Sequence, residues 1–141
     1  RVWITHTEMT RFWISFEQSF ALVLFALENM EGGEIFIPKI PSMKLVDLFD
    51  AIVPDIEREV IGIRPGEKLH EDLITKEEAR RTVELEKYFV ILPEFEDVEN
   101  RFIKHINNGN KTHHDFTYAS DINKEWLTTE DLQQIINKLE L

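Results

Sequence analysis

Residues Ser15 to Pro38, SFEQSFALVLFALENMEGGEIFIP, place a helix directly before a strand, and this alternation decides the expected fold class. Ser15 is a typical N-cap and Gln18 stands at capping-box spacing. Apolar residues then recur at helical spacing as far as Met30, on a face made of Phe16, Phe20, Val23, Leu24 and Leu27. Gly32-Gly33 ends this helix. The run Glu34 to Pro38 is rich in β-branched and aromatic residues, which predicts a strand.

The rest of the chain continues the alternation of helices and strands. Further strands are expected at Trp3–Thr5, Val60–Ile63, Tyr88–Leu92 and Phe116–Ala119. Further helices are expected after three capping residues, Ser42, Thr75 and Thr128. The second helix ends at Pro54 and has an apolar face of Leu45, Leu48, Phe49 and Ile52. The inward face of the last helix is expected to consist of Leu132, Ile135, Ile136 and Leu139. The polar run from Phe95 to His114 is expected to be a loop. The pattern predicts an α/β fold, a small mixed lobe with too few strands for a complete doubly wound sheet.

Composition limits the classes of function. The chain has 141 residues, a size that suits one domain or one lobe of a larger enzyme. A formal net charge of -11 argues against general nucleic-acid binding, which requires a basic surface. No apolar run is long enough to cross a bilayer, so no membrane partner is expected. The absence of cysteine excludes disulfides and thiolate metal sites and is compatible with the cytoplasm, the expected location.

The most informative motif for function is Gly62-Ile63-Arg64-Pro65-Gly66-Glu67-Lys68-Leu69. Pro65-Gly66 predicts a turn at the end of a strand, with Arg64 beside Glu67. A guanidinium in this position can bind a phosphate through two parallel hydrogen bonds, with Glu67 on a ribose hydroxyl or orienting the arginine. The alternative is a surface turn with a solvated ion pair.

Other charged residues are less specific. Arg11 lies among large apolar groups, so it needs a partner, either an internal carboxylate (Glu8 or Glu17) or an anionic ligand. Lys39 reads as a loop lysine. The potential metal ligands His105, His113, His114 and Asp115 match no common zinc spacing, so we expect solvated side chains and no metal.

Three catalytic or cofactor motifs are absent from the sequence. The chain contains no Gly-x-Gly-x-x-Gly dinucleotide fingerprint, no phosphate-binding P-loop and no nucleophile elbow. It also begins in the middle of an expected strand without an initiator methionine, which suggests that the sequence is truncated upstream.

Three segments together resemble a known family. These segments are Met9–Ile14, Gly33–Lys44 and Gly62–Glu71, and a weaker similarity follows from Tyr118 to Thr128. They look like the C-terminal part of the inverting UDP-N-acetylglucosamine 4,6-dehydratases, extended short-chain dehydrogenase/reductases of surface-polysaccharide and pseudaminic acid biosynthesis. The resemblance covers about residues 3 to 74, whereas residues 75 to 115 match poorly.

The resemblance implies a division of labour. In that family an N-terminal Rossmann domain binds NADP and carries the catalytic residues, while a C-terminal lobe holds the UDP-sugar. Residues 1–141 would be this lobe, with no catalytic residue and no cofactor of its own, inactive alone and part of a homo-oligomer in the full-length enzyme. Arg11 and Arg64 would contact the diphosphate, Glu67 the ribose, and Met43 would line the nucleotide pocket. The implied reaction oxidises the sugar at C4, eliminates water across C5 and C6 and returns the hydride to C6 with inversion at C5.

Two alternatives stay open. The lobe could belong to a UDP-sugar epimerase of the same superfamily, because the residues that set the chemistry would lie upstream. It could instead be a non-catalytic binding or assembly module, since two of its helices have strongly apolar faces.

Overall fold

The computed structural model describes residues 1–94 and 97–139. By its internal contacts the chain divides into two compact units. Unit 1 consists of Arg1–Trp13, Ile40–Glu71 and the chain from Ala119 onward, and unit 2 consists of Ile14–Lys39 and Asp72–Tyr118. The mixed α/β class predicted from the sequence is confirmed. No helix in the described part of the chain has both the length and the hydropathy needed to cross a bilayer.

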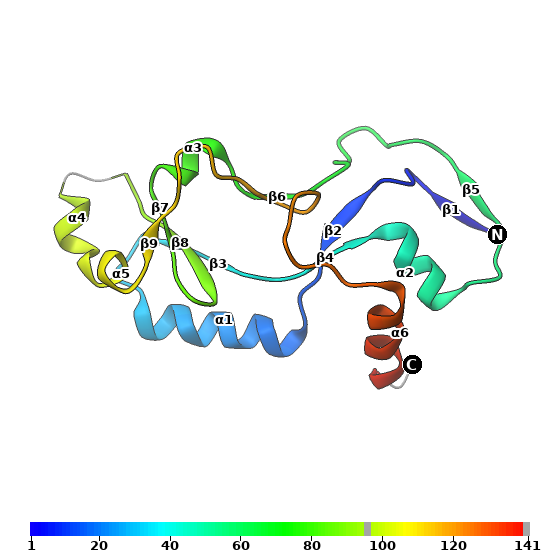
Figure 1. The fold of residues 1–141 in the computed structure, drawn as a ribbon, viewed down its shortest axis with the longest axis horizontal. Helices are drawn as coiled ribbons and strands as arrows, with labels where there is room; N and C mark the ends of the chain where they lie inside the picture. Colours follow the sequence, from blue (N-terminus) through cyan, green and yellow to red (C-terminus); the bar gives the residue numbers. More distant parts are fainter. Residues whose placement is uncertain (95–96, 140–141) are drawn as a thin grey trace. The chain divides into compact units, whose positions relative to one another are not determined.

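Unit 1 contains two short ribbons and two helices (Figure 1). Strand β1 (Val2–Ile4) pairs in parallel with β5 (Arg58–Val60), and β2 (Thr10–Phe12) pairs antiparallel with β4 (Ser42–Lys44). Helix α2 (Leu45–Ile52) follows β4 at once and packs against α6 (Thr129–Lys138). Their shared core is formed by Met43, Ala51 and Leu132, with Trp13, Leu48, Leu127 and Ile136 packed against it.

Unit 2 is built on a four-stranded sheet of order β3-β8-β7-β9, in which all neighbours are antiparallel. Its strands are β3 (Ile35–Pro38), β8 (Tyr88–Ile91), β7 (Thr82–Glu84) and β9 (Asn110–Lys111). The helices are α1 (Phe16–Asn29), α3 (Lys76–Ala79), α4 (Val98–Arg101) and α5 (Ile103–Asn108). The remaining short strands are β6 (Asp72–Ile74) and β10 (Tyr118–Ala119). A core of Val83, Val90, Leu92 and Phe102 lies between the sheet and α4–α5.

The predicted helix starts are confirmed where a capping box is present. Ser15 with Gln18, Thr75 with Glu78 and Thr128 with Asp131 each form reciprocal side-chain and backbone hydrogen bonds. The predicted cap at Ser42 is wrong. Ser42 lies in β4, and α2 begins three residues later without a side-chain cap, because the ladder with β2 takes up this segment.

The apolar face of helix α1 is exposed to solvent. Its apolar residues share one face, as predicted, yet none of them is buried in unit 2. Phe16 is 84% exposed and Leu27 61% exposed, and Phe20, Val23 and Leu24 are also exposed. A contiguous apolar stripe of this size is typical of an interaction surface.

Three other predictions are corrected. The strand expected at Val60–Ile63 ends at Val60, and the exposed residues after it leave the β1–β5 ribbon. The expected loop from Phe95 to His114 contains α4, α5 and β9, because apolar Val98, Phe102 and Ile106 fasten these elements to the core of unit 2; residues 95 and 96 lie outside the described residues. At the C-terminus, Leu132 is buried as expected but Leu139 is exposed.

Candidate functional site

The segment Arg64–Glu67 folds into a tight turn that its own carboxylate closes. The backbone N–H of Glu67 donates to the carbonyl of Arg64 over 3.0 Å, and the backbone N–H of Arg64 donates to Glu67 Oε2 over 3.0 Å. Gly66 has φ of +81°, which a glycine after Pro65 adopts without strain in a type II turn. The Pro-Gly turn predicted from the sequence is therefore confirmed.

The two charged side chains of the turn differ in their contacts: Glu67 is hydrogen-bonded within unit 1, whereas Arg64 faces solvent. Glu67 accepts from the backbone of Arg64 and, through Oε1, from the hydroxyl of buried Thr5 over 3.2 Å. The alternative of a solvated ion pair with Glu67 is not seen: within residues 1–94 and 97–139 no hydrogen bond or ion pair involves the guanidinium of Arg64, which is exposed. Arg64 therefore presents a positive charge and a full set of N–H donors to solvent.

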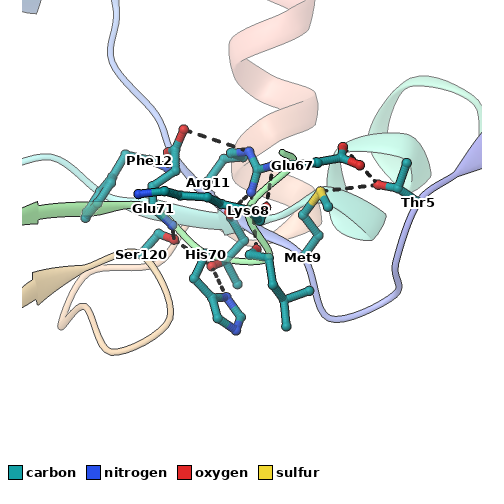
Figure 2. Close-up of polar contacts among 11 residues, drawn as sticks. Thr5, Met9, Arg11, Phe12, Glu67, Lys68, His70, Glu71 and Ser120 are labelled. Carbon is teal, nitrogen blue, oxygen red and sulfur yellow. Dashed lines mark hydrogen bonds and ion pairs between the residues drawn. The ribbon is translucent and has the colours of Figure 1, made fainter. Parts of the chain in front are cut away.

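Arg11 lies on β2, with its guanidinium against the segment that follows the turn (Figure 2). Its Nη1 donates to the carbonyls of Thr10 (2.7 Å) and Leu69 (3.2 Å), and its Nη2 donates to the carbonyl of Lys68 (2.9 Å). Its Nε lies 3.8 Å from Glu71 Oε1. Arg11 therefore ties residues 68–71 to β2.

The expectation that an internal carboxylate is a partner of Arg11 is confirmed, but the residues named as examples, Glu8 and Glu17, do not occupy that place. Backbone carbonyls and Glu71 take that place, because the ladder between β2 and β4 fixes Arg11 opposite Met43 while residues 68–71 pass alongside. Three of the five N–H donors of a guanidinium are engaged in this way. The Nε–H faces the carboxylate of Glu71, so one Nη2–H is left without an acceptor among the described residues.

Met43 is a core residue of unit 1. It is 6% exposed and packs with Ala51 and Leu132 between α2 and α6. Its strand β4 holds it next to Arg11 across the ladder. Its expected contact with a nucleotide stays a prediction.

Sequence reasoning missed four polar residues that fasten this site. Glu71 Oε2 accepts the backbone N–H of Phe12 over 2.8 Å, and Thr10, His70 and Ser120 form a chain of short hydrogen bonds beside it (Figure 2). The available signal was that His70-Glu71 directly follows the Arg-Pro-Gly-Glu-Lys-Leu run and that Ser120 falls in the weaker segment of the resemblance. Neither pattern shows that the three segments meet in space.

The group of potential metal ligands does not form one site. His113, His114 and Asp115 lie together and are exposed, in agreement with the solvated interpretation. His105 is buried on α5, and its Nε2 lies 3.0 Å from Glu34 Oε1. Lys39 lies in a loop, as expected, and forms an ion pair with Glu84 at 2.7 Å.

Glu34 is a buried carboxylate at the turn between α1 and β3. Burial raises its pKa, but hydrogen bonds from the backbone N–H groups of Glu31 (2.6 Å) and Gly32 (2.7 Å), together with His105, bring that pKa below the ordinary value of 4.5. The carboxylate therefore closes the Gly-Gly turn as an anion.

Unit 2 also contains an open cleft of about 620 Å³ between α1, the β7–β8 turn and α5. The stacked rings of Phe25 and Tyr88 form its apolar wall, and Lys87 and Lys104 lie at its edge. Arg11, Met43, Arg64 and Glu67 are not among its lining residues. The cleft therefore does not coincide with the predicted nucleotide site.

Comparison with known proteins gives consistent matches. The family model described as "Polysaccharide biosynthesis protein" matches residues 1–93. The chain is 47% identical to the UDP-N-acetylglucosamine 4,6-dehydratase (inverting) of Campylobacter jejuni subsp. jejuni serotype O:2, over 97% of this chain and 42% of that protein. It is 30% identical to the UDP-glucose 4-epimerase of Rickettsia massiliae, over 97% of this chain and 41% of that protein. The X-ray structure of Pen from Bacillus thuringiensis matches with a TM-score of 0.77 and 28% identity, over 99% of this chain and 41% of that one.

These matches confirm the resemblance inferred from the three sequence segments, and they extend it through the region that looked dissimilar. They also show that the chain spans about two fifths of the length of the curated relatives it matches.

Proposed function

Because the chain belongs to the family of polysaccharide biosynthesis proteins and is related to the UDP-N-acetylglucosamine 4,6-dehydratases, we propose that it is the UDP-sugar-binding lobe of such a dehydratase. The relatives are more than twice as long, so the proposed activity is that of a longer protein, and this chain supplies substrate binding.

The single observation that carries the proposal is the Arg64–Glu67 turn. Its carboxylate is engaged by the turn itself, so the guanidinium of Arg64 is exposed and not neutralised by the acid next to it. A diphosphate fits this arrangement, because a guanidinium donates two parallel, charge-assisted hydrogen bonds to phosphate oxygens.

The remaining site residues have matching roles in the proposal. Arg11 has one Nη2–H in reserve for a second phosphate contact while it holds residues 68–71. The carboxylate of Glu67 has lone pairs beyond the two hydrogen bonds that it accepts, which a ribose hydroxyl can use. Met43 would line the apolar side of the nucleotide pocket, supported by the core residues that pack against it.

NADP chemistry is proposed to reside outside this chain. The residues present do not fit a dinucleotide site, because no Gly-x-Gly-x-x-Gly run is available to bring a backbone close to a pyrophosphate. We therefore assign the cofactor and the catalytic residues to an N-terminal Rossmann domain of the full-length protein. The exposed apolar face of α1 supports this assignment, since a partner domain would shield it from water.

Titration of the full-length protein with UDP tests the substrate-binding role. We expect saturable binding that Arg64→Ala weakens. A folded protein that does not bind UDP at millimolar concentration would refute the proposal and favour a role in assembly.

The second candidate is a UDP-sugar epimerase, favoured by the 30% identity to a UDP-glucose 4-epimerase along nearly the whole chain. The two enzymes differ in product and not in the diphosphate they hold. Incubation with UDP-N-acetylglucosamine separates them, because a dehydratase gives a 4-keto-6-deoxy sugar and an epimerase gives the 4-epimer.

A further inference from the structure

Two neighbouring residues of β2 hold the same downstream segment from opposite sides. Successive side chains of a strand point to opposite faces, so Thr10 and Arg11 diverge. Arg11 reaches the carbonyls of Lys68 and Leu69, while Thr10 Oγ1 lies 2.7 Å from His70 Nδ1.

The contact with His70 continues into a buried chain of hydroxyl groups. Ser120 Oγ lies 2.6 Å from Thr10 Oγ1 and accepts the backbone N–H of Glu71 over 2.9 Å. The backbone N–H of Ser120 donates in return to the carbonyl of Glu71 over 2.8 Å. Ser120 is 0% and Thr10 4% exposed, so water does not replace these partners.

Counting donors fixes the direction of this chain. Each hydroxyl has one hydrogen to donate. When Ser120 donates to Thr10 and Thr10 donates to His70 Nδ1, both hydroxyl hydrogens have an acceptor. When Nδ1 carries the proton instead, Thr10 must donate to Ser120, and the Ser120 hydroxyl then has no further acceptor among the hydrogen bonds of the described residues. A buried donor without an acceptor is unfavourable, so the network favours the His70 tautomer in which Nδ1 accepts from Thr10 and Nε2 carries the proton.

We propose that Ser120, Thr10 and His70 form a positioning relay that holds the Arg64–Glu67 turn in its binding geometry. The relay and Arg11 both hold residues 68–71, the segment that directly follows the turn. Thr5 holds the turn itself through Glu67. This inference rests on the proposed UDP-binding role, in which His70 acts through the turn and does not contact the ligand.

The tautomer of His70 can be measured directly. Long-range ¹H–¹⁵N correlation spectra of the full-length protein above pH 8 distinguish a protonated Nε2 from a protonated Nδ1. The relay predicts Nε2–H for His70 in the wild type and a mixture of tautomers in Thr10→Val. A wild-type His70 protonated on Nδ1 would overturn the relay.

UDP binding tests the positioning role with matched variants. His70→Ala removes the acceptor of Thr10 and should weaken UDP affinity by about 3- to 10-fold, the scale of one net hydrogen bond. His70→Asn keeps an acceptor oxygen near the place of Nδ1 and should restore most of the affinity, as Thr10→Ser should relative to Thr10→Val. Thermal melts check that each variant is folded.

A double-mutant cycle shows whether the relay acts through the turn. In an Arg64→Ala background, His70→Ala should have little further effect on UDP affinity. An equal loss in both backgrounds, or no rescue by His70→Asn, would overturn the proposal. Unchanged affinity in His70→Ala refutes the relay alone, whereas a wild type that binds no UDP refutes the proposed function and the relay together.

Discussion

Replacement of Arg64 by alanine should weaken UDP binding without lowering the stability of the protein, because this side chain is not part of the packed interior of unit 1. It is exposed, and within the described residues its guanidinium has no hydrogen bond or ion pair to lose. The turn is closed by the backbone and by Glu67, which the substitution leaves in place. The free energy of unfolding should therefore change by less than about 0.5 kcal/mol.

Binding should respond much more strongly. A hydrogen bond to a charged group contributes about 1.5–3 kcal/mol, and each 1.4 kcal/mol corresponds to about tenfold in affinity. Arg64→Ala should consequently raise the Kd for UDP about 10- to 150-fold. Arg64→Lys should recover only part of this loss, since an ammonium lacks the planar pair of donors that a phosphate accepts from arginine.

Isothermal titration calorimetry of the full-length protein with UDP provides the measurement. Arg80→Ala is the matched control, because Arg80 is an exposed arginine in unit 2 and its loss lowers the net charge by the same one unit. The control should bind UDP as the wild type does. An Arg64→Ala variant within twofold of the wild type, or an equal loss in Arg80→Ala, would refute the assignment of Arg64 to the site.

Three further outcomes follow from the packing. Leu132→Ala should lower the free energy of unfolding in urea by about 2–5 kcal/mol, since Leu132 is fully buried, whereas Leu139→Ala should change it by less than about 0.5 kcal/mol. Because the pKa of Glu34 is lowered on folding, this carboxylate stabilises the fold above the carboxyl pKa of the unfolded chain, near 4.5, and the stabilisation is lost as the pH falls through the lower pKa of the folded state. Glu34→Gln should therefore reduce the loss of stability at acid pH, and an unchanged slope of stability against pH would contradict this prediction. Leu27→Glu should lower the melting temperature of the full-length protein if a second domain covers α1, and an unaltered melt would show that this face stays in water.

Local signals in the sequence predicted the elements that depend on local contacts. Helices begin at Ser15, Thr75 and Thr128 as expected, because both partners of each capping box lie within one turn of helix. The Pro65-Gly66 turn formed for the same reason. The α/β class followed from these elements.

What the sequence could not predict depends on distant contacts. Strand β2 exists through its ladder with β4, some thirty residues away, and three residues are too few to identify a strand from the sequence. The partner of Arg11 was sought among its sequence neighbours but lies at residues 68–71. The exposure of α1 could not be predicted either, because helical periodicity identifies the apolar face of a helix but not whether another surface covers that face.

The central claim is that this chain holds a UDP-sugar for dehydration, and the product of the full-length protein tests it most directly. Incubation with UDP-N-acetylglucosamine, followed by NMR of the sugar nucleotide, should yield a 4-keto-6-deoxy sugar with inverted configuration at C5. A 4-epimer that retains its 6-hydroxyl group, or unaltered UDP-N-acetylglucosamine with a folded protein loaded with NADP, would contradict the account.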